Sequence, residues 1–148
     1  MEKGKISYAG IGAAAAGVIG IMGVYSTWWE TDTTSYNGTA DISGRLALAM
    51  AIAVFAFGAA YVALSDAQVR RAMGALATLC AVVLCFACIW GVSRAGDVAP
   101  GATVASGLFV SVLGGVLGIA AGFLVMRDNA LAEDAAADPS LSDAPAST

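Results

Sequence analysis

The sequence predicts an all-α membrane protein, a bundle of four transmembrane helices with a short β-hairpin-like outer loop between helices 1 and 2. Hydrophobic residues make up 59% of the chain and charged residues 12%, which is too apolar for an ordinary soluble domain. Four runs without ionisable residues each reach the roughly 20 residues that a helix needs to cross about 30 Å of hydrocarbon. The runs lack the alternation of barrel strands, so helices are the structure that pairs every backbone polar group in lipid.

The expected transmembrane domain covers residues 1–126, with spans at about 6–27, 46–65, 70–93 and 103–126. The first span follows charged residues, as a secretory signal does. Its apolar region is longer than the roughly 7 to 15 residues of a signal and ends without a convincing cleavage site, so we expect an uncleaved helix. Residues 127–148 contain five acidic residues, two prolines and no aromatic residue. This composition predicts a disordered acidic cytoplasmic tail, either simply solvating or a docking peptide.

The distribution of positive charge predicts the orientation. Five basic residues fall on one side of the predicted spans, namely Lys3, Lys5, Arg70, Arg71 and Arg127, against Arg45 and Arg94 on the other. Because positive charges are retained in the cytoplasm, we expect a multi-pass protein of the plasma membrane with both termini cytoplasmic. Aromatic residues agree as interfacial anchors, with Trp28, Trp29 and Trp90 expected at the outer interface and Tyr8 and Tyr61 at the inner one.

The loop from Ser26 to Arg45 is the longest polar passage between the first span and the tail. Asn37-Gly38 is typical of a two-residue type I′ turn, in which both residues need positive φ, so we expect a hairpin with Tyr36 facing Thr39. Asn37-Gly38-Thr39 also matches a glycosylation acceptor. The alanine-rich, acidic composition is typical of prokaryotes, which favours a plain turn.

Two later connections carry turn and capping signals. Ser65 and Gln68 have the spacing of a capping box, with Ser65 as N-cap, and Asp66 can pair with Arg70 four residues on. Pro100-Gly101 breaks the chain, so the fourth helix is expected to begin near residue 103.

Small residues recur at four-residue spacing in two spans and predict a helix-packing interface, because helices in lipid associate through close backbone contact. The fourth span carries two such rows and the first span one: Gly114, Gly118 and Gly122; Gly107, Ser111 and Gly115; Gly12, Ala16 and Gly20. Two interpretations stay open, packing within one bundle and an interface with a second copy or another membrane protein.

Cys85 and Cys88 form a C-x-x-C pair, with Cys80 deeper in the same span. Reactive pairs of this kind generally lie at a helix N-terminus, where the dipole activates the thiol, whereas this pair lies in the C-terminal half of its helix. We therefore expect buried structural thiols, with a membrane thiol-disulfide oxidoreductase as a remote alternative. The chain has no histidine, so we expect no Cys/His metal site and no metal or cofactor.

Other function classes lack their residues. Ion and proton pathways usually need an ionisable group within the membrane, and small multidrug transporters depend on a membrane-embedded glutamate that this chain does not have. There is no phosphate-binding glycine loop before a lysine, no serine with a histidine base, and no basic patch for nucleic acid. We expect no catalytic residues and a non-catalytic accessory, assembly or interaction subunit, in contact with lipid and with a membrane-protein partner or a second copy. The alternative is a homo-oligomeric transporter or channel with an uncharged pore.

The four-span plan with tryptophans opening the first outer loop is loosely similar to claudin-like proteins, but the paired loop cysteines of that family are missing. The chain more closely resembles the uncharacterised small four-helix membrane proteins of high-GC actinobacteria and haloarchaea. That resemblance covers the whole bundle, rests on general pattern, carries over no functional residue and implies no activity.

Overall fold

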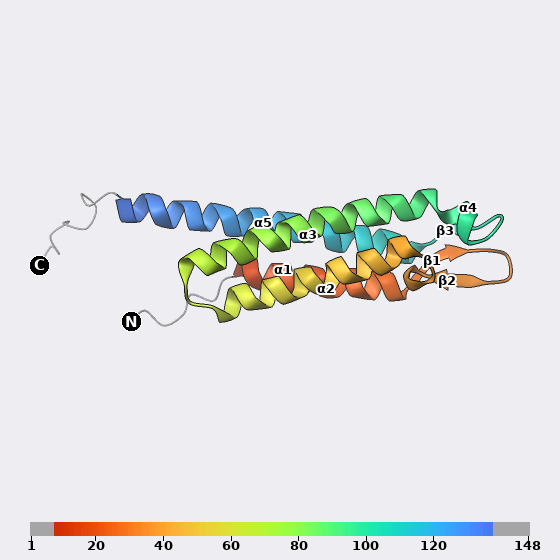
Figure 1. Cartoon of the computed structure of the whole chain (residues 1–148), viewed down its shortest axis with the longest axis horizontal. Helices are drawn as coiled ribbons and strands as arrows, with labels where there is room; N and C mark the ends of the chain where they lie inside the picture. Colours follow the sequence, from red (N-terminus) through yellow and green to blue (C-terminus); the bar gives the residue numbers. More distant parts are fainter. Residues whose placement is uncertain (1–7, 138–148) are drawn as a thin grey trace, which may run out of the picture.

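Four long helices run side by side along the long axis of the molecule (Figure 1). The structure, a computed structural model, describes residues 8–137, and it describes side chains for residues 8–127. The long helices are α1 (Tyr8–Tyr25), α2 (Ile42–Ala63), α3 (Ala67–Ser93) and α5 (Ser106–Ala137). Each is long and apolar enough to cross a membrane, which confirms the prediction of four long apolar helices.

The four helices form one helical body in which the chain reverses direction at each connection (Figure 1). α1 packs between α2 and α5, and α3 packs between the same two helices on the other side. α1 therefore begins and α5 ends at one end of the helical body, which we call the tail end. The opposite end carries the strands of residues 8–137, and we call it the sheet end.

A three-stranded antiparallel sheet, β1 (Thr27–Glu30), β2 (Ser35–Asn37) and β3 (Thr103–Val104), covers the sheet end in the order β2-β1-β3. At its centre, Trp29 pairs with Tyr36 on one side and Val104 on the other. The third strand was not predicted from the sequence. It joins the connection between α1 and α2 to the connection between α3 and α5, which also contains the short helix α4 (Ala95–Val98).

The hairpin between α1 and α2 exists, but its predicted turn is wrong. The chain turns at Thr31 to Thr34, where the Thr31 amide donates to the Thr34 carbonyl at 2.9 Å. Asn37 is extended, and the 3-10 helix η1 (Gly38–Ala40) follows it. Tyr36 consequently pairs with Trp29 instead of Thr39.

Close packing explains the glycine in the Asn37-Gly38 pair. A Cβ atom on Gly38 would lie 2.8 Å from Cε2 of Trp28 and 2.9 Å from the carbonyl oxygen of Val24. Within residues 8–137, positive φ is confined to Gly101, at 77°. Gly38 therefore serves close approach, whereas the type I′ interpretation assumed positive φ.

α2 begins four residues before its predicted start because Asp41 caps it. The Asp41 carboxylate accepts a hydrogen bond from the Ser43 amide at 3.1 Å, which satisfies one of the unpaired donors of the first turn. Arg45 lies in this turn, and its Nε donates to the Thr39 carbonyl at 3.1 Å. The helix accommodates the charge because the long side chain reaches out of the apolar region.

α3 has a different cap from the predicted one. Asp66 is the N-cap in place of Ser65, and its Oδ1 accepts from the amides of Gln68 at 2.9 Å and Val69 at 3.0 Å. The Arg70 guanidinium lies 4.4 Å from the centroid of the Tyr61 ring. This cation–π contact takes the place of the expected pairing with Asp66.

α5 differs from prediction at both ends. It begins at Ser106 because residues 103–104 belong to β3, and it continues to Ala137. The first part of the segment predicted as a disordered tail is therefore helical. Residues 1–7 and 138–148, with the predicted cytoplasmic Lys3 and Lys5 and the rest of the tail, lie outside the described residues.

Candidate functional site

The two tryptophans of β1 are both fully buried at the sheet end. Successive residues of a regular strand point to opposite faces, but the register of β1 shifts between Thr27 and Trp29. Such an irregularity re-aims side chains and allows both rings to face the protein interior. The rings meet edge to face, with centroids 5.3 Å apart. Trp28 and Trp29 are therefore core residues, and their prediction as interfacial anchors is wrong because neither ring reaches the surface.

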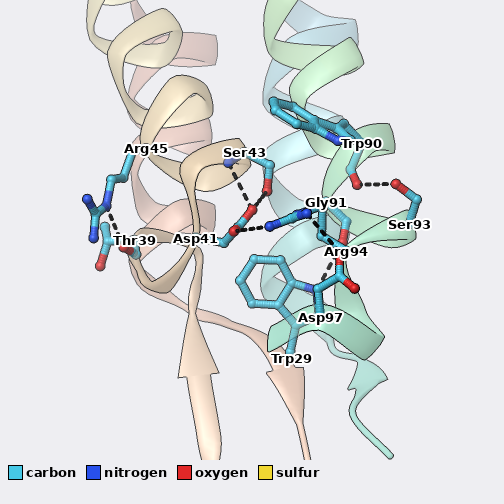
Figure 2. Close-up of polar contacts among 10 residues, drawn as sticks. All are labelled: Trp29, Thr39, Asp41, Ser43, Arg45, Trp90, Gly91, Ser93, Arg94 and Asp97. Carbon is cyan, nitrogen blue, oxygen red and sulfur yellow. Dashed lines mark hydrogen bonds and ion pairs between the residues drawn. The ribbon is translucent and has the colours of Figure 1, made fainter. Parts of the chain in front are cut away.

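Each buried indole has a hydrogen-bond acceptor. Trp28 Nε1 donates to the carbonyl of Gly23 at 3.0 Å. Trp29 Nε1 donates to the carbonyl of Gly91 at 3.0 Å, as Figure 2 shows. A Cβ atom on Gly91 would lie 2.9 Å from Cζ3 of Trp28. Gly91 thus serves both rings. Its lack of a side chain leaves room for the Trp28 ring, and its carbonyl oxygen accepts the hydrogen bond from Trp29.

An ion pair crosses the sheet end beside the tryptophans. Arg94 Nη2 lies 3.2 Å from Asp41 Oδ1, and Arg94 Nη1 lies 2.7 Å from Asp97 Oδ2 (Figure 2). The other Asp41 oxygen accepts from the Ser43 hydroxyl at 2.8 Å as well as from its amide. Asp41 therefore joins the start of α2 to the end of α3, and its side chain is only 12% exposed.

The environment of Asp41 stabilises its charged form. Burial alone raises the pKa of the carboxyl, but hydrogen bonds from the Ser43 amide, the Arg94 guanidinium and the Ser43 hydroxyl outweigh it. The net result is a pKa of about 2, below the ordinary value of 3.8. The hydrogen bond to Asp41 also raises the pKa of Arg94.

The sheet end combines a buried base, made of Trp28, Trp29 and the Asp41–Arg94 pair, with an exposed tip. Residues 32–35 at the turn between β1 and β2 are exposed, and the β1–β2 loop extends beyond the helical body (Figure 1). The hydroxyls of this tip can donate and accept hydrogen bonds, and the Asp32 carboxylate can accept them. Within the described side chains, no group of three or more histidine, cysteine, aspartate or glutamate residues is placed to hold a metal ion.

The other predicted anchors divide into exposed and buried residues. Trp90 is 44% exposed on α3, and Tyr8 is 85% exposed at the start of α1, so both rings can reach a surrounding solvent. Tyr61 is 2% exposed and belongs to a small core at the tail end with Ala9 and Val125. The anchor prediction for Tyr61 is wrong because its ring packs inside the protein beneath Arg70.

Several of the predicted packing residues lie where α5 contacts α1 or the segment that directly follows α1. A Cβ atom on Gly114 would lie 2.6 Å from the Gly20 nitrogen and 2.9 Å from the Ala16 carbonyl oxygen. Gly107 approaches the Thr27 carbonyl in the same way, and Gly12 faces Ala121 more loosely. These contacts lie within the chain.

The remaining residues of the two rows on α5 are also packed internally. Gly115 and Gly118 face Ala81 of α3, and Gly122 faces Thr78 of the same helix. Ser111 is fully buried, and its hydroxyl donates to the Gly107 carbonyl at 3.1 Å. Of the two interpretations left open by the sequence, these contacts correspond to packing within one chain.

The three cysteines are free thiols on α3. Cys88 is buried in the core beneath the sheet, whereas Cys80 and Cys85 are half-buried. Cys85 approaches Gly115 of α5, so it fills space between two helices.

Comparisons of this chain with models of protein families, with curated proteins and with solved structures find no match. The candidate site is therefore defined by its own geometry. Sequence reasoning missed the Asp41–Arg94 pair, although one signal was available. Both residues flank predicted spans at the same predicted end of the helices, where opposite charges can meet.

Proposed function

We propose that the chain is a non-catalytic interaction subunit of the plasma membrane, whose four long helices span the bilayer and whose sheet end binds a partner. The exposed side chains support the membrane location. Large apolar residues cover the outside of the helical body, among them Phe55, Leu79, Phe86, Ile89, Phe109 and Phe123. Water disfavours contiguous apolar surface of this kind, whereas lipid solvates it.

The charges support an orientation with the tail end in the cytoplasm. Arg70, Arg71 and Arg127 lie at the tail end, against Arg45 and Arg94 at the sheet end. Because the side of a membrane protein richer in lysine and arginine is retained in the cytoplasm, this distribution supports a sheet end that faces away from the cytoplasm.

The observation that carries the interaction role is the rigid base beneath the exposed tip. Buried Trp28 and Trp29 fix β1, and the Asp41–Arg94 pair fixes the helix ends beside it. An isolated two-stranded hairpin is marginal in water, so support from the buried base favours an ordered tip. A surface ordered before binding loses less conformational entropy on binding, which is an advantage for recognition.

Site-specific photo-crosslinking in intact cells tests the interaction role. A photoreactive amino acid in place of Thr33 at the tip is compared with the same residue in place of Ala59, which is exposed on α2. We expect a discrete protein adduct from position 33 and lipid adducts from position 59. The same protein adduct from both positions, or none from position 33, contradicts binding at the sheet end.

Reconstitution into liposomes provides a second check on the proposal. The purified chain should leave an imposed ion gradient intact, as protein-free liposomes do. Ion flux that rises with the amount of protein would favour a homo-oligomeric channel or transporter over an interaction subunit.

A further inference from the structure

The fold explains only part of the segment Asn37-Gly38-Thr39. The sequence allowed two interpretations, a type I′ turn and a glycosylation acceptor, and the turn is wrong. Asn37 is the last residue of β2 and is extended, with φ of −82° and ψ of 170°. The contact with Trp28 explains Gly38, but it gives no reason for Asn37 or for the Thr39 hydroxyl. The acceptor motif accounts for both, because it requires an asparagine and, two residues later, a serine or threonine.

A hydrogen bond joins the two side chains that define the acceptor motif. Thr39 Oγ1 donates to Asn37 Oδ1 at 2.7 Å. Asn37 also occupies the N-cap position of η1, but its side chain makes no capping hydrogen bond there. The bond from Thr39 engages the amide oxygen and leaves the other branch of the amide, Nδ2, available for reaction. Nδ2 is the atom that is modified in an Asn-linked glycan.

Asn37 lies on the exposed side of an edge strand. In β2, Ser35 and Asn37 are exposed and Tyr36 between them is half-buried, as the alternation of a strand requires. The order β2-β1-β3 leaves one side of β2 without a neighbouring strand among the described residues. A glycan at Asn37 therefore extends into solvent without displacing the core. Its bulk also shields the open edge, which would otherwise invite pairing with other chains.

We propose that Asn37 is an N-glycosylation site, to which a membrane-bound transferase attaches a glycan on the side away from the cytoplasm. The donor is a sugar whose anomeric carbon is linked to the phosphate of a lipid carrier. That carbon–oxygen bond breaks, and its electron pair leaves with the carrier phosphate. A bond from Asn37 Nδ2 to the anomeric carbon forms, and Nδ2 gives one proton to a base of the transferase. The site rests on the proposed orientation, because this motif is modified in proteins exported from the cytoplasm, and it is independent of any partner at the tip.

Intact-mass spectrometry of the full chain tests the site, with the protein purified from membranes of the organism that encodes it. The sequence contains a single Asn-x-Ser/Thr motif, so we expect one glycosylated species, with fragmentation placing the added mass on Asn37. Asn37→Gln and Thr39→Val should each lose this mass entirely, whereas Thr39→Ser keeps the hydroxyl and should keep the glycan. Ser35→Ala removes the exposed hydroxyl on the same side of β2 and is the matched control, which should be glycosylated like the parent.

A second acceptor at the opposite end separates failure of the site from failure of the proposed orientation. Leu131→Thr completes the motif at Asn129, in the part of α5 at the tail end, and Asn129 should remain unmodified because this end is proposed to be cytoplasmic. Glycosylation of Asn129 would contradict the orientation and the site with it. An unmodified Asn37 beside an unmodified Asn129 would overturn the site alone, as would added mass on a hydroxyl of the tip in place of Asn37. A Thr39→Val protein still modified at Asn37 would refute the role of the motif.

Discussion

The indole nitrogen of Trp29 donates a hydrogen bond to the carbonyl oxygen of Gly91, at 3.0 Å and across 62 positions of sequence. The acceptor lies in the last turn of α3, where carbonyl groups lack the usual partners within the helix. The same oxygen also accepts from the Arg94 amide at 3.2 Å. This single carbonyl therefore connects the central strand of the sheet with the end of a long helix.

Trp29→Phe should destabilise the protein by about 1 kcal/mol, because it removes this buried hydrogen bond and keeps an aromatic ring. The Arg94 amide still satisfies the Gly91 carbonyl, which limits the cost. Trp90→Phe is the control, since Trp90 is exposed. Thermal unfolding in detergent measures both variants. Equal melting temperatures for the two would show that the Trp29 hydrogen bond contributes nothing.

Stability should fall at low pH through Asp41. Its pKa in the folded protein is about 2, below the ordinary 3.8, so its contribution is fully present above pH 4 and is lost as pH falls towards 2. Asp41→Asn keeps a capping side chain and removes the charge. The difference in melting temperature between the parent and Asp41→Asn should therefore shrink between pH 4 and pH 2. A constant difference over that range would contradict the assigned pKa.

Gly38→Ala should lower stability by about 1–3 kcal/mol, because the new methyl group would overlap the Trp28 ring and the Val24 carbonyl. Gly96→Ala is the matched control, since nothing lies within 4 Å of its Cβ position in α4. There the helix propensity of alanine favours unchanged or slightly higher stability. Denaturation in detergent compares the two, and an undamaged Gly38→Ala protein would refute the close approach.

Gly114→Ala should separate α1 from α5, because its Cβ would meet the Gly20 nitrogen and the Ala16 carbonyl of the facing backbone. Backbone atoms cannot rotate away as a side chain does, so we expect a cost of about 1–3 kcal/mol. Gly12→Ala meets Ala121 at an ordinary 3.6 Å and should be tolerated. Melting temperature and size-exclusion profile in detergent distinguish the variants. Similar behaviour of both would show that the α1–α5 contact adapts easily.

The proposed orientation predicts opposite labelling of the two ends of the protein. In a background without the three native cysteines, a cysteine replacing Ser35 should react with an impermeant thiol reagent added to intact cells. A cysteine replacing Ser142 should react after the membrane is permeabilised. Labelling of both positions in intact cells would disprove a cytoplasmic C-terminus.

Hydropathy was sufficient to predict the four long helices, because each of them is a long and continuously apolar stretch of the sequence. Hydropathy placed the start of α2 too late, because the charged residue Arg45 was taken as the boundary before which the helix could not begin. The charge lies inside the helix, and its side chain reaches the Thr39 carbonyl. Aspartate immediately before the helix was the better signal for its start.

The sheet end was predicted less well because the conformation of its residues depends on contacts with residues distant in the sequence. Asn37-Gly38 has the local signature of a turn, but Gly38 is required by the Trp28 ring ten positions earlier. The two tryptophans have the residue type and the sequence position of interfacial anchors, but a shift in strand register buries both. The β3 pairing brings together residues about 75 positions apart, which no local pattern encodes.

The sheet topology determines when, during synthesis of the chain, the sheet can be completed. β1 meets β2 within a few residues, but its other edge pairs with β3, which leaves the ribosome only after α1, α2 and α3. Trp29 likewise obtains its acceptor only once Gly91 has been made. A nascent chain that carries only α1 and α2 therefore has an open strand edge and an unbonded indole. Closure of the sheet is therefore a late event in the synthesis of the chain, and it distinguishes a completed molecule from one whose synthesis has stalled.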